Sequence, residues 1–531
     1  MRSSSIDTQR VMSAPDLPEA QLNPLLRRVD WRFLLHAPRV RRAVCFADGE
    51  LRRGLELVAE EVIAAESGTA NCDLAVVARP DLPTLVAAST ALRPGGICYI
   101  EWPRLGPGGR RRLAAMLRTA GFERPRSYLA WRSARRASVW LPLESPSAAR
   151  YFKRELHART RRPVTRVLRS LVTLGGRWGI AGTLSTVAWK PGAPGDELPE
   201  PAFFGTIRRD WSRWGFPGTP DALSLMLLTG GPRSLSKVAG FVFTDAGSGP
   251  RLVVKMARAP GAAPGLMREA RILRALEASC AGGPLRMPRV IFSVDDHTLV
   301  AVGETALRGV PLLSLLNRRS YRALALQATD WLIRLALCSR QSGAPAAGRV
   351  VAEEWGQFER AFGHVLSARQ LADTRRVLSP LDGVHSVCEH RDFSPWNVFL
   401  APDRQLAVLD WESAEMAGVP ALDLMYFLVY LGAGLGGKIT ADGVLGASRE
   451  ALDPETFTGA VYRECLGRYA DGMGLDPGCL PALRLLLWLI HARSEHARLA
   501  ADTGGAPSDE ALRGSLFLRL WEAERLRQQS G

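Results

Sequence analysis

The chain has 531 residues, which is too long for one typical core, so we expect two or three domains. Its composition, with 47% hydrophobic and 23% charged residues, is that of a globular protein and excludes a disordered or fibrous one. The eight cysteines form no CxxC pair and no cluster with histidine, which predicts buried, reduced thiols and no zinc site. No secretory signal or membrane span is recognisable, so we expect a cytoplasmic protein.

The net charge of +16 is concentrated in the first part of the chain. Residues 1–200 contain 32 Lys or Arg and 19 Asp or Glu, whereas the remainder contains 37 and 34. This excess suits an anionic membrane surface bound by the basic segment 150–170, or an arginine-rich composition on solvated faces. Basic motifs interleaved with aromatic residues are not found, so we expect no nucleic-acid partner.

The first 145 residues predict a disordered tail over 1–26 and an α/β module over 27–145. Strand-like apolar runs alternate there with helical stretches, which is typical of a Rossmann-like parallel sheet. "SYLAWRSARRASVWLPL" predicts a closing hairpin. The predicted strands are "AVCFA", "DLAVVA" and "GGICYIEW", and the predicted helices are "GELRRGLELVAEEVIAA", "LPTLVAASTAL" and "GGRRRLAAMLRTAGF".

The rest of the chain predicts a connector followed by two lobes. Residues 146–204 contain a basic helical stretch and a linker rich in Pro and Gly, "WKPGAPGDELPEPAFFG". Strand-like runs dominate 205–307 around one helix, "GLMREARILRALEA", and 308–531 is mainly helical. We therefore expect a second, α+β part with a small β-rich lobe and a larger, mainly helical lobe.

The stretch "CDLAVVARPDLPTLVAASTALRPGGICYIEW" resembles the second half of a class I methyltransferase domain. An Asp-led strand, a helix, an "LRPGG" turn and a later "AGF" occur in the order of that family. The turn after the first strand holds Gly49 and Gly54 but no GxGxG pattern, which the family uses to approach its cofactor. About 26 residues separate the first strand from "DLAVVA". We therefore predict a truncated Rossmann-like module that binds no S-adenosylmethionine.

A glycine-rich turn opens the β-rich lobe. "LLTGGPRSLSKVAGFVF" places Gly230, Gly231, Ser234 and Ser236 between two predicted strands. Glycines and small hydroxyl residues let backbone N–H groups reach phosphate oxygens, so this turn is a candidate phosphate site. Glycine-rich hairpins are also common as plain structure, and that alternative stays open.

A charged residue at the end of an apolar strand gives a second candidate. Lys255 ends "RLVVK", and Glu269 lies on the helix that follows. A Lys–Glu pair between strand and helix can present the ammonium group to the α- and β-phosphates of a nucleotide. A short hinge near Glu304 then leads to the helical lobe, and we place Glu304 with the nucleotide-binding residues.

Two acids and an amide flank the strand pair near 397–410. In phosphoryl transfer one carboxylate accepts a hydrogen bond from the attacking hydroxyl, and other oxygen ligands hold Mg²⁺ against the phosphates. Asp392 is placed to orient the hydroxyl, while Asn397 and Asp410 can both bind the metal. His390 is grouped with the catalytic loop, where it is expected to hold the backbone.

This set of residues resembles the aminoglycoside phosphotransferase and choline kinase-like family over about 220–500. The resemblance implies the bilobal protein-kinase-like fold. It covers a loop of the type H-x-D-x-x-x-x-N, a "DWE" metal motif, and a later P-x-x-D-L motif whose Asp usually supports the loop. The matching residues here are His390, Asp392 and Asn397, then Asp410, Trp411 and Glu412, and finally Pro420, Asp423 and Leu424.

These observations predict a Mg²⁺-dependent kinase that uses ATP or GTP and a small-molecule acceptor with a hydroxyl group. The acceptor expected is a sugar, an amino alcohol or a glycan precursor. A polycationic aminoglycoside is less favoured, because the acids available for it, Glu353, Glu354 and Glu412, lie in a half that is nearly neutral. The alternative is a pseudokinase that acts as a scaffold or regulatory protein.

Overall fold

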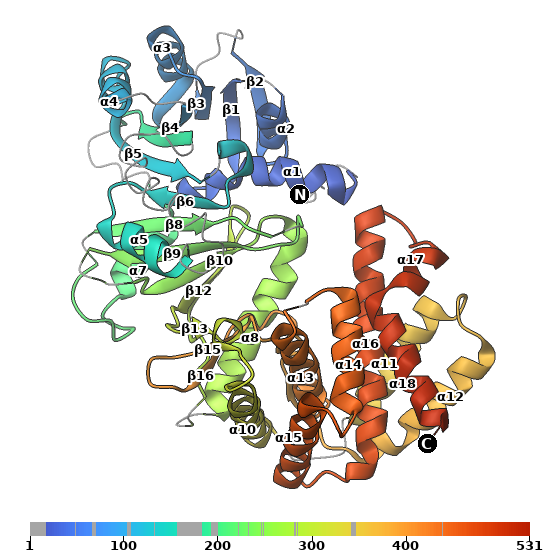
Figure 1. Ribbon diagram of the computed structural model, residues 1–531. Helices are drawn as coiled ribbons and strands as arrows, with labels where there is room; N and C mark the ends of the chain where they lie inside the picture. The colour runs from blue at the N-terminus through green and yellow to red at the C-terminus, as the bar shows by residue number, and fades with distance from the viewer. Residues whose placement is uncertain are drawn as a thin grey trace, which may run out of the picture. The chain divides into compact units, whose positions relative to one another are not determined.

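The computed structural model divides the chain into two compact units, each described by itself (Figure 1). Unit 1 comprises Met1–Ala262 and Val294–Ala301, and unit 2 comprises Ala263–Ser293 and Val302–Gly531. The structure describes residues 17–530 except 48, 66–70, 103–107, 132, 157–182, 193–199, 221, 232, 246, 248, 281–282, 284, 341–346 and 438.

Unit 1 begins with a parallel sheet of four strands in the order β2-β1-β3-β4. Helix α3 (Leu82–Ala91) connects β3 to β4, and α4 (Gly109–Thr119) follows β4. Leu85 and Leu117 of these helices are buried in one cluster with Ile100 of β4. An α/β layer is therefore present, as the sequence predicts. The strands are β1 (Val40–Phe46), β2 (Ala59–Ala64), β3 (Cys72–Ala78) and β4 (Leu92–Trp102).

Strand β2 lies where the sequence predicts the second half of one long helix. Helix α2 (Glu50–Glu56) ends after two turns, and the chain then pairs in parallel with β1, with Val62 opposite Ala43 and Ile63 opposite Val44. The β-branched side chains of Val62 and Ile63 suit this extended conformation. The predicted helix is thus wrong beyond Glu56. The short connection between β1 and β3 contains both a helix, α2, and a strand, β2.

Antiparallel strands continue the sheet beyond β4. Strand β7 (Thr183–Trp189) lies between β4 and β5 (Glu123–Ala130) and pairs antiparallel with both. All seven of its residues are buried because it lies inside the sheet. Strand β5 also pairs with β6 (Val139–Pro142), which is the predicted hairpin. The sequence assigns residues 183–189 to the connector, and the structure assigns them to the sheet instead.

The same sheet then includes the strands that flank the glycine-rich turn. Strand β6 pairs antiparallel with β8, with Trp140 opposite Leu227. The order in unit 1 is β10-β9-β8-β6-β5-β7-β4-β3-β1-β2. The boundary of unit 1 consequently lies at Ala262 and not near residue 204, because these hydrogen bonds join the front module to the next strands. The added strands are β8 (Leu223–Leu228), β9 (Val238–Thr244) and β10 (Leu252–Met256), while β11 (Val290–Asp295) and β12 (Val300–Thr305) cross the division between the units.

The described N-terminal segment is helical, so the predicted disordered tail is wrong for residues 19–26. Helix α1 (Glu19–Arg28) buries Leu25 and Leu26, and a 3₁₀ helix, η1 (Asp30–Leu34), follows it. The guanidinium of Arg28 binds both carboxylate oxygens of Glu101 at 2.6 and 2.5 Å. These partners lie far away in sequence, which is why the local composition did not reveal the helix.

Much of the predicted connector lies outside the described residues. Its beginning forms α5 (Pro146–Tyr151) and a π-helical turn, η3 (Phe152–Leu156). Most of the basic segment 150–170 lies in 157–182 and the centre of the Pro/Gly-rich linker in 193–199, both outside the described residues. A short helix, α7 (Phe203–Asp210), follows the linker.

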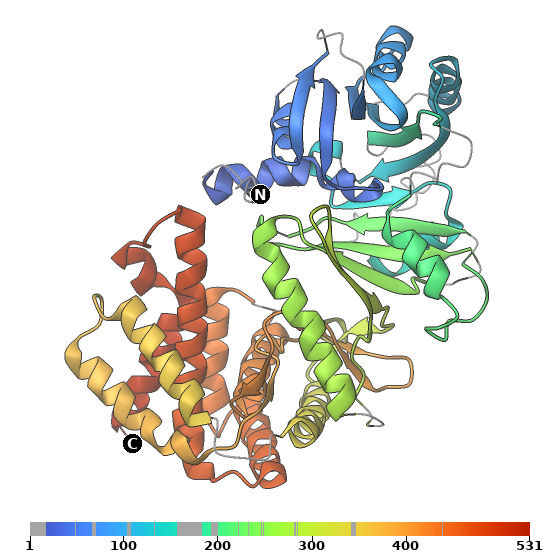
Figure 2. The same ribbon diagram turned by 180° about the vertical axis from the view of Figure 1, so that it is seen from behind.

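Unit 2 is mainly helical, as predicted for the larger lobe. Helix α13 is buried along almost its whole length, and α16 contacts α11, α12, α13 and α18. The long helices lie side by side in both views (Figures 1 and 2). The helices are α8 (Ala263–Ser279), α9 (Leu312–Leu315), α10 (Tyr321–Ser339), α11 (Ala347–Phe362), α12 (Ala368–Leu378), α13 (Leu422–Leu435), α14 (Ala441–Leu452), α15 (Phe457–Met473), α16 (Leu480–Thr503), α17 (Asp509–Gly514) and α18 (Leu516–Ser530).

Short strands in unit 2 support the predicted catalytic loop. Strands β15 and β16 form the expected antiparallel pair, with Val398 opposite Val408. Strand β14 pairs antiparallel with β17, so both ends of the catalytic region are fixed to neighbouring strands. The strands are β13 (Val310–Pro311), β14 (Val387–Glu389), β15 (Val398–Leu400), β16 (Leu406–Val408) and β17 (Glu415–Gly418).

Two of the cysteines differ from the prediction of reduced thiols. Cys280, directly after α8, and Cys338, near the end of α10, form a disulfide with their Cα atoms 5.2 Å apart. Their distance in sequence hides this pairing from local motifs. The other cysteines are free and buried, namely Cys45, Cys72, Cys98, Cys388, Cys465 and Cys479.

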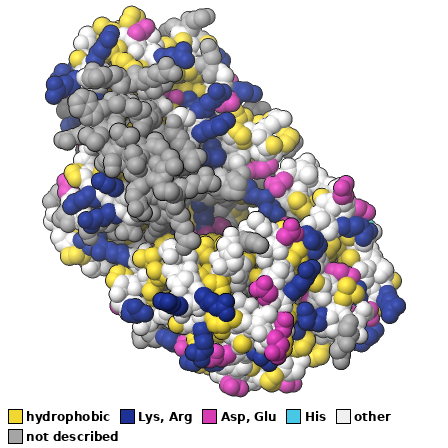
Figure 3. Space-filling view, in the orientation of Figure 1, with side chains coloured by type: hydrophobic (Ala, Val, Ile, Leu, Met, Phe, Trp, Pro, Cys, Tyr) yellow, Lys and Arg dark blue, Asp and Glu magenta, His cyan; other side chains and the backbone are white. Residues whose placement is uncertain are grey.

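The surface reflects the charge distribution of the sequence. In Figure 3 the Lys and Arg side chains are spread over the visible face of both units, whereas most of the visible Asp and Glu side chains lie on unit 2. Within the described part of the chain, no helix combines the length and apolarity that a membrane span requires.

Candidate active site

The loop between β14 and β15 holds Asp392 and Asn397 against each other. The side-chain amide of Asn397 donates to Oδ2 of Asp392 at 2.9 Å and to its backbone oxygen at 3.1 Å. Because this amide nitrogen is used inside the loop, the amide oxygen of Asn397 is the atom suited to a cation. The structure thus brings together two residues that the sequence separates by five positions.

His390 is fully buried, and its contacts hold this loop in place. The backbone N–H of Asp392 donates to Nδ1 of His390 at 3.3 Å, so Nε2 carries the proton and donates to the carbonyl of Leu409 at 3.0 Å. The imidazole also packs edge-on against the Trp411 ring, with the centroids 4.6 Å apart. His390 therefore ties the loop to the end of the neighbouring strand.

Asp423 holds the backbone of the same loop. It accepts hydrogen bonds from the backbone N–H groups of His390 at 2.6 Å and Arg391 at 2.9 Å. Arg391 has a φ of 62°, a left-handed conformation that costs a non-glycine residue energy and often occurs at functional sites. Burial, together with the nearby Glu389 carboxylate, raises the pKa of Asp423.

Arg391 belongs to an ion-pair network that the sequence does not predict. Its guanidinium lies 3.1 Å from Glu354 of α11 and 3.5 Å from Glu389. Arg493 of α16 binds the other oxygen of Glu354 at 2.6 Å. No local motif signals these contacts, because their partners lie on separate helices. Glu354, considered above as a ligand for a cationic acceptor, is thus paired with two arginines.

The "DWE" loop follows β16 and contains a second strained residue. Asp410 has a φ of 68°. The backbone N–H of Trp411 donates to Oε1 of Glu269 at 2.9 Å, and its indole N–H donates to the carbonyl of Val408 at 3.2 Å. Glu269 is fully buried on α8, so this helix holds the loop directly after Asp410. This is a contact of Glu269 that the sequence does not predict.

The pKa of the Asp392 carboxylate is influenced by two other acids. Burial raises the pKa of Asp392 to about 7, and the negative charges of Asp410 and Glu412 add to this increase, while the hydrogen bond from Asn397 opposes it. Acids that raise one another's pKa would be stabilised together by a divalent cation. The oxygen atoms offered by Asp410 and Asn397 are of the kind that Mg²⁺ prefers, so the residues fit this metal.

The glycine-rich turn in unit 1 has its carbonyl groups directed inward. Arg258, which is 2% exposed, donates to the carbonyls of Thr229 and Gly230, both at 3.0 Å, and to that of Arg233 at 2.8 Å. Its Nε binds Asp30 of η1 at 3.0 Å. The buried side chain of Arg258 therefore fixes the conformation of the turn. No local pattern in the sequence predicts this contact.

The remaining predicted residues of the turn differ in burial, since Gly231 is exposed whereas Ser234 is 3% exposed. Gly231 has a φ of 102°, and a Cβ atom there would lie 2.4 Å from Ser236, so glycine is required. The hydroxyl of Ser236 accepts from the N–H of Arg233 at 3.3 Å. Ser234 donates both its N–H and its hydroxyl to the carboxylate of Glu19.

The last two predicted nucleotide residues lie on strands. Lys255 is on β10, opposite Ala239 of β9, and is partly exposed. Glu304 is on the part of β12 that belongs to unit 2 and is 2% exposed. In unit 2 the contacts above connect Glu269 and His390 to the loops that carry Asp392, Asn397 and Asp410.

Part of the chain is similar to known proteins. Residues 238–456 match the sequence model of the phosphotransferase enzyme family. None of the curated proteins matches the chain.

Solved aminoglycoside phosphotransferases are among the similar structures. A thermostable mutant of APH(4)-Ia with ADP and hygromycin B is 15% identical with a TM-score of 0.39, and the alignment covers 60% of this chain and 98% of that one. A type VIII aminoglycoside-3'-phosphotransferase is 20% identical with a TM-score of 0.34, covering 54% and 98%. APH(3'')-Id from Streptomyces rimosus, with ADP and streptomycin, is 17% identical with a TM-score of 0.30, covering 48% and 90%.

Proposed function

We propose that this protein is a small-molecule kinase that transfers the γ-phosphoryl group of ATP or GTP to a hydroxyl group. The observation that carries the proposal is the contact of Asn397 with Asp392, beside the carboxylate of Asp410. Phosphoryl transfer needs one carboxylate to orient the nucleophile and oxygen ligands to hold the metal, and these residues supply both. The phosphotransferase-family match over 238–456 supports the same chemistry.

Each residue then has a defined role. Asp392 accepts the hydrogen bond of the attacking hydroxyl, and Asn397 and Asp410 hold Mg²⁺, which neutralises charge on the phosphates when bound. Lys255 binds phosphate oxygens, and the turn at Gly230, with Gly231, Ser234 and Ser236, covers them. Glu304 is assigned to nucleotide binding. His390 and Glu269 position the loops and do not touch the reacting atoms.

The acceptor we favour is a neutral or weakly charged hydroxyl compound, such as a sugar, an amino alcohol or a glycan precursor. Glu354 is paired with two arginines, and Glu495 accepts hydrogen bonds from Arg498 at 2.8 Å and from the backbone of Phe517 at 3.2 Å. Trp396, one residue before Asn397, is 38% exposed and packs edge-on against Tyr430. An aromatic face beside this loop can pack on the apolar face of a sugar ring or on the ammonium group of an amino alcohol.

For the front module we retain the proposal of a methyltransferase-like domain that binds no S-adenosylmethionine. Trp31 of η1 stacks on Tyr99 of β4, with ring centroids 3.7 Å apart and planes 3° apart. Glu101, near the carboxyl end of β4, is bound by Arg28. Ligands of parallel sheets usually bind near such strand ends, and here the chain's own side chains fill the space around Tyr99.

A thermal-shift titration with ATP and GTP, with and without Mg²⁺, tests the kinase assignment. Ligand at 100 times its Kd stabilises the folded state by about 2.7 kcal/mol, so the melting temperature should rise measurably. Asp410→Asn should lose the Mg²⁺-dependent part of the shift, whereas the exposed control Asp471→Asn should keep it. Asp392→Asn should bind nucleotide yet lose turnover with sugar and amino-alcohol acceptors. A wild type that shifts with neither nucleotide would favour the pseudokinase alternative.

A further inference from the structure

The carboxylate of Glu19 occupies the donors of the glycine-rich turn. One of its oxygens accepts the backbone N–H of Ser234 at 2.6 Å, and the other accepts the Ser234 hydroxyl at 2.5 Å. A backbone N–H and a hydroxyl that converge on one anion are the groups that would bind a phosphate at this turn. Both donors are used completely by Glu19, so a phosphate can bind Ser234 only after Glu19 leaves.

The turn presents hydrogen-bond donors to an anion, and contacts with the same N-terminal segment help to fix its conformation. Arg258 draws three carbonyl groups of the turn inward, which removes their negative ends from the outer side. Asp30, eleven residues after Glu19, accepts a hydrogen bond from Nε of Arg258 at 3.0 Å. The segment from Glu19 to Asp30 thus contacts the turn directly through Glu19 and indirectly through the contact of Asp30 with Arg258.

We propose that Glu19 acts as an autoinhibitory phosphate mimic, so that α1 gates nucleotide binding at the glycine-rich turn. The proposal rests on the proposed function, because it requires the turn to bind phosphates. The helix is anchored further along by the buried Leu25 and Leu26 and by the pairing of Arg28 with Glu101. Glu19 is the first residue of the helix and is only partly buried, so its side chain can swing away while these anchors stay in place.

Titration calorimetry of the full chain with MgATP and MgGTP tests this gate. If Glu19 blocks the turn in most molecules, the apparent Kd of the wild type is raised by the inverse of the open fraction. Glu19→Gln keeps the size of the side chain and removes its charge, so it should bind nucleotide about tenfold more tightly, corresponding to the loss of one charged contact. Glu60→Gln, a change at an exposed glutamate of β2 in the same unit, should leave the Kd unchanged.

Inorganic tripolyphosphate serves as a second probe, because it has the phosphates without the base. It should also bind Glu19→Gln more tightly than the wild type, and Glu19→Asp should lie between them. The melting temperature of each unliganded variant is measured alongside, and a tighter Kd in a variant that melts normally supports the gate.

The possible failures are distinguishable. If the wild type binds MgATP or MgGTP and Asp410→Asn weakens that binding, but Glu19→Gln and the wild type have the same Kd, the gate is refuted and the kinase assignment stands. If neither nucleotide binds the wild type or Glu19→Gln, both the kinase assignment and the gate are refuted.

Discussion

His491 illustrates how a single side chain near the catalytic loop depends on its surroundings. Its ring stacks on Tyr426, with centroids 4.4 Å apart and planes 9° apart, and it also packs on Phe517. Burial, with smaller effects from the charges of Arg391 and Arg493, lowers the pKa of His491 from 6.5 to about 3. The folded protein therefore keeps this histidine neutral at a pH where the unfolded chain protonates it.

This shift predicts a pH-dependent contribution to stability. Because the pKa of His491 is lower in the folded state, the neutral ring contributes fully to the free energy of unfolding above pH 6.5. This contribution is lost as the pH falls from 6.5 toward 3. At pH 5 the loss amounts to about 2 kcal/mol. His491→Phe preserves the stack and should remove this part of the slope in urea unfolding measured between pH 5 and 7.

The exposed His385 provides the matched control, because His385→Phe should leave the slope as it is in the wild type. Equal slopes for His491→Phe and the wild type would contradict the assignment.

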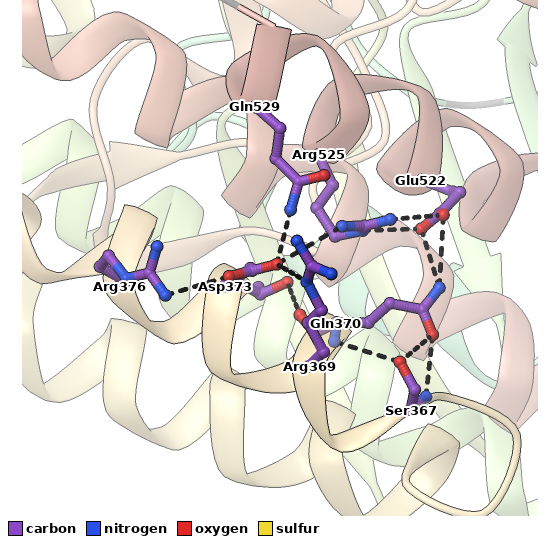
Figure 4. Close-up of polar contacts among 9 residues, drawn as sticks. Ser367, Arg369, Gln370, Asp373, Arg376, Glu522, Arg525 and Gln529 are labelled. Atoms are coloured by element: carbon purple, nitrogen blue, oxygen red, sulfur yellow. Dashed lines mark hydrogen bonds and ion pairs between the residues drawn. The ribbon is translucent and has the colours of Figure 1, made fainter.

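At the scale of elements, one carboxylate connects α12 to the C-terminal helix α18 (Figure 4). Asp373 of α12 accepts from Gln529 at 2.5 Å and lies 3.8 Å from Arg525, both on α18. Arg376 and Arg369 of α12 approach the same carboxylate, but they are largely exposed and contribute little. The contacts to Gln529 and Arg525 are the ones that hold α18.

Removing this carboxylate should destabilise unit 2. Asp373→Ala leaves the buried Arg525 without one of its two acidic neighbours and removes the acceptor of Gln529, which is exposed, so we expect a cost of about 1–2 kcal/mol. The midpoint of urea unfolding should fall accordingly. Asp471→Ala, at an exposed aspartate of α15, should leave the midpoint within error of the wild type. A comparable fall in both variants would mean that the network does not hold the helix.

The disulfide between Cys280 and Cys338 links the end of α8 to the end of α10. Its two cysteines are 58 residues apart, and closing a loop of that length stabilises the folded state by about 4 kcal/mol in the chain-entropy treatment. Protein purified without reductant should therefore melt at a higher temperature than the same protein in dithiothreitol. Cys338→Ser should melt like the reduced protein in both buffers, and insensitivity of the wild type to reductant would contradict the bond.

At the scale of the whole molecule, local patterns predicted most elements of the fold. Strand-like apolar runs marked β8, β9 and β10, and the spacing of His390, Asp392 and Asn397 marked the loop between β14 and β15. These signals are local, because hydrophobic periodicity and a short loop are set by neighbouring residues. Their positions in the structure agree with the sequence.

Features that depend on distant partners could not be predicted. Strand β7 is recognisable only once β4 and β5 are in place on either side of it. The same holds for Glu19 with Ser234 and for Arg391 with Glu354, which pair across 215 and 37 residues. An arginine or glutamate on an exposed-looking helix has the same local sequence whether it is solvated or paired, so only the tertiary structure distinguishes the two.

The pairing of β6 with β8 has a consequence for any change that would separate the two parts of this sheet. Because the backbone hydrogen bonds of Val139 and Trp140 continue into Leu227 and Leu228, neither part of the sheet has a free edge at the junction. A gene rearrangement that separated the two parts would expose two strand edges prone to aggregation, unless a new neighbour covered both. The front module and the strands around the glycine-rich turn are therefore expected to be prone to aggregation as separate fragments.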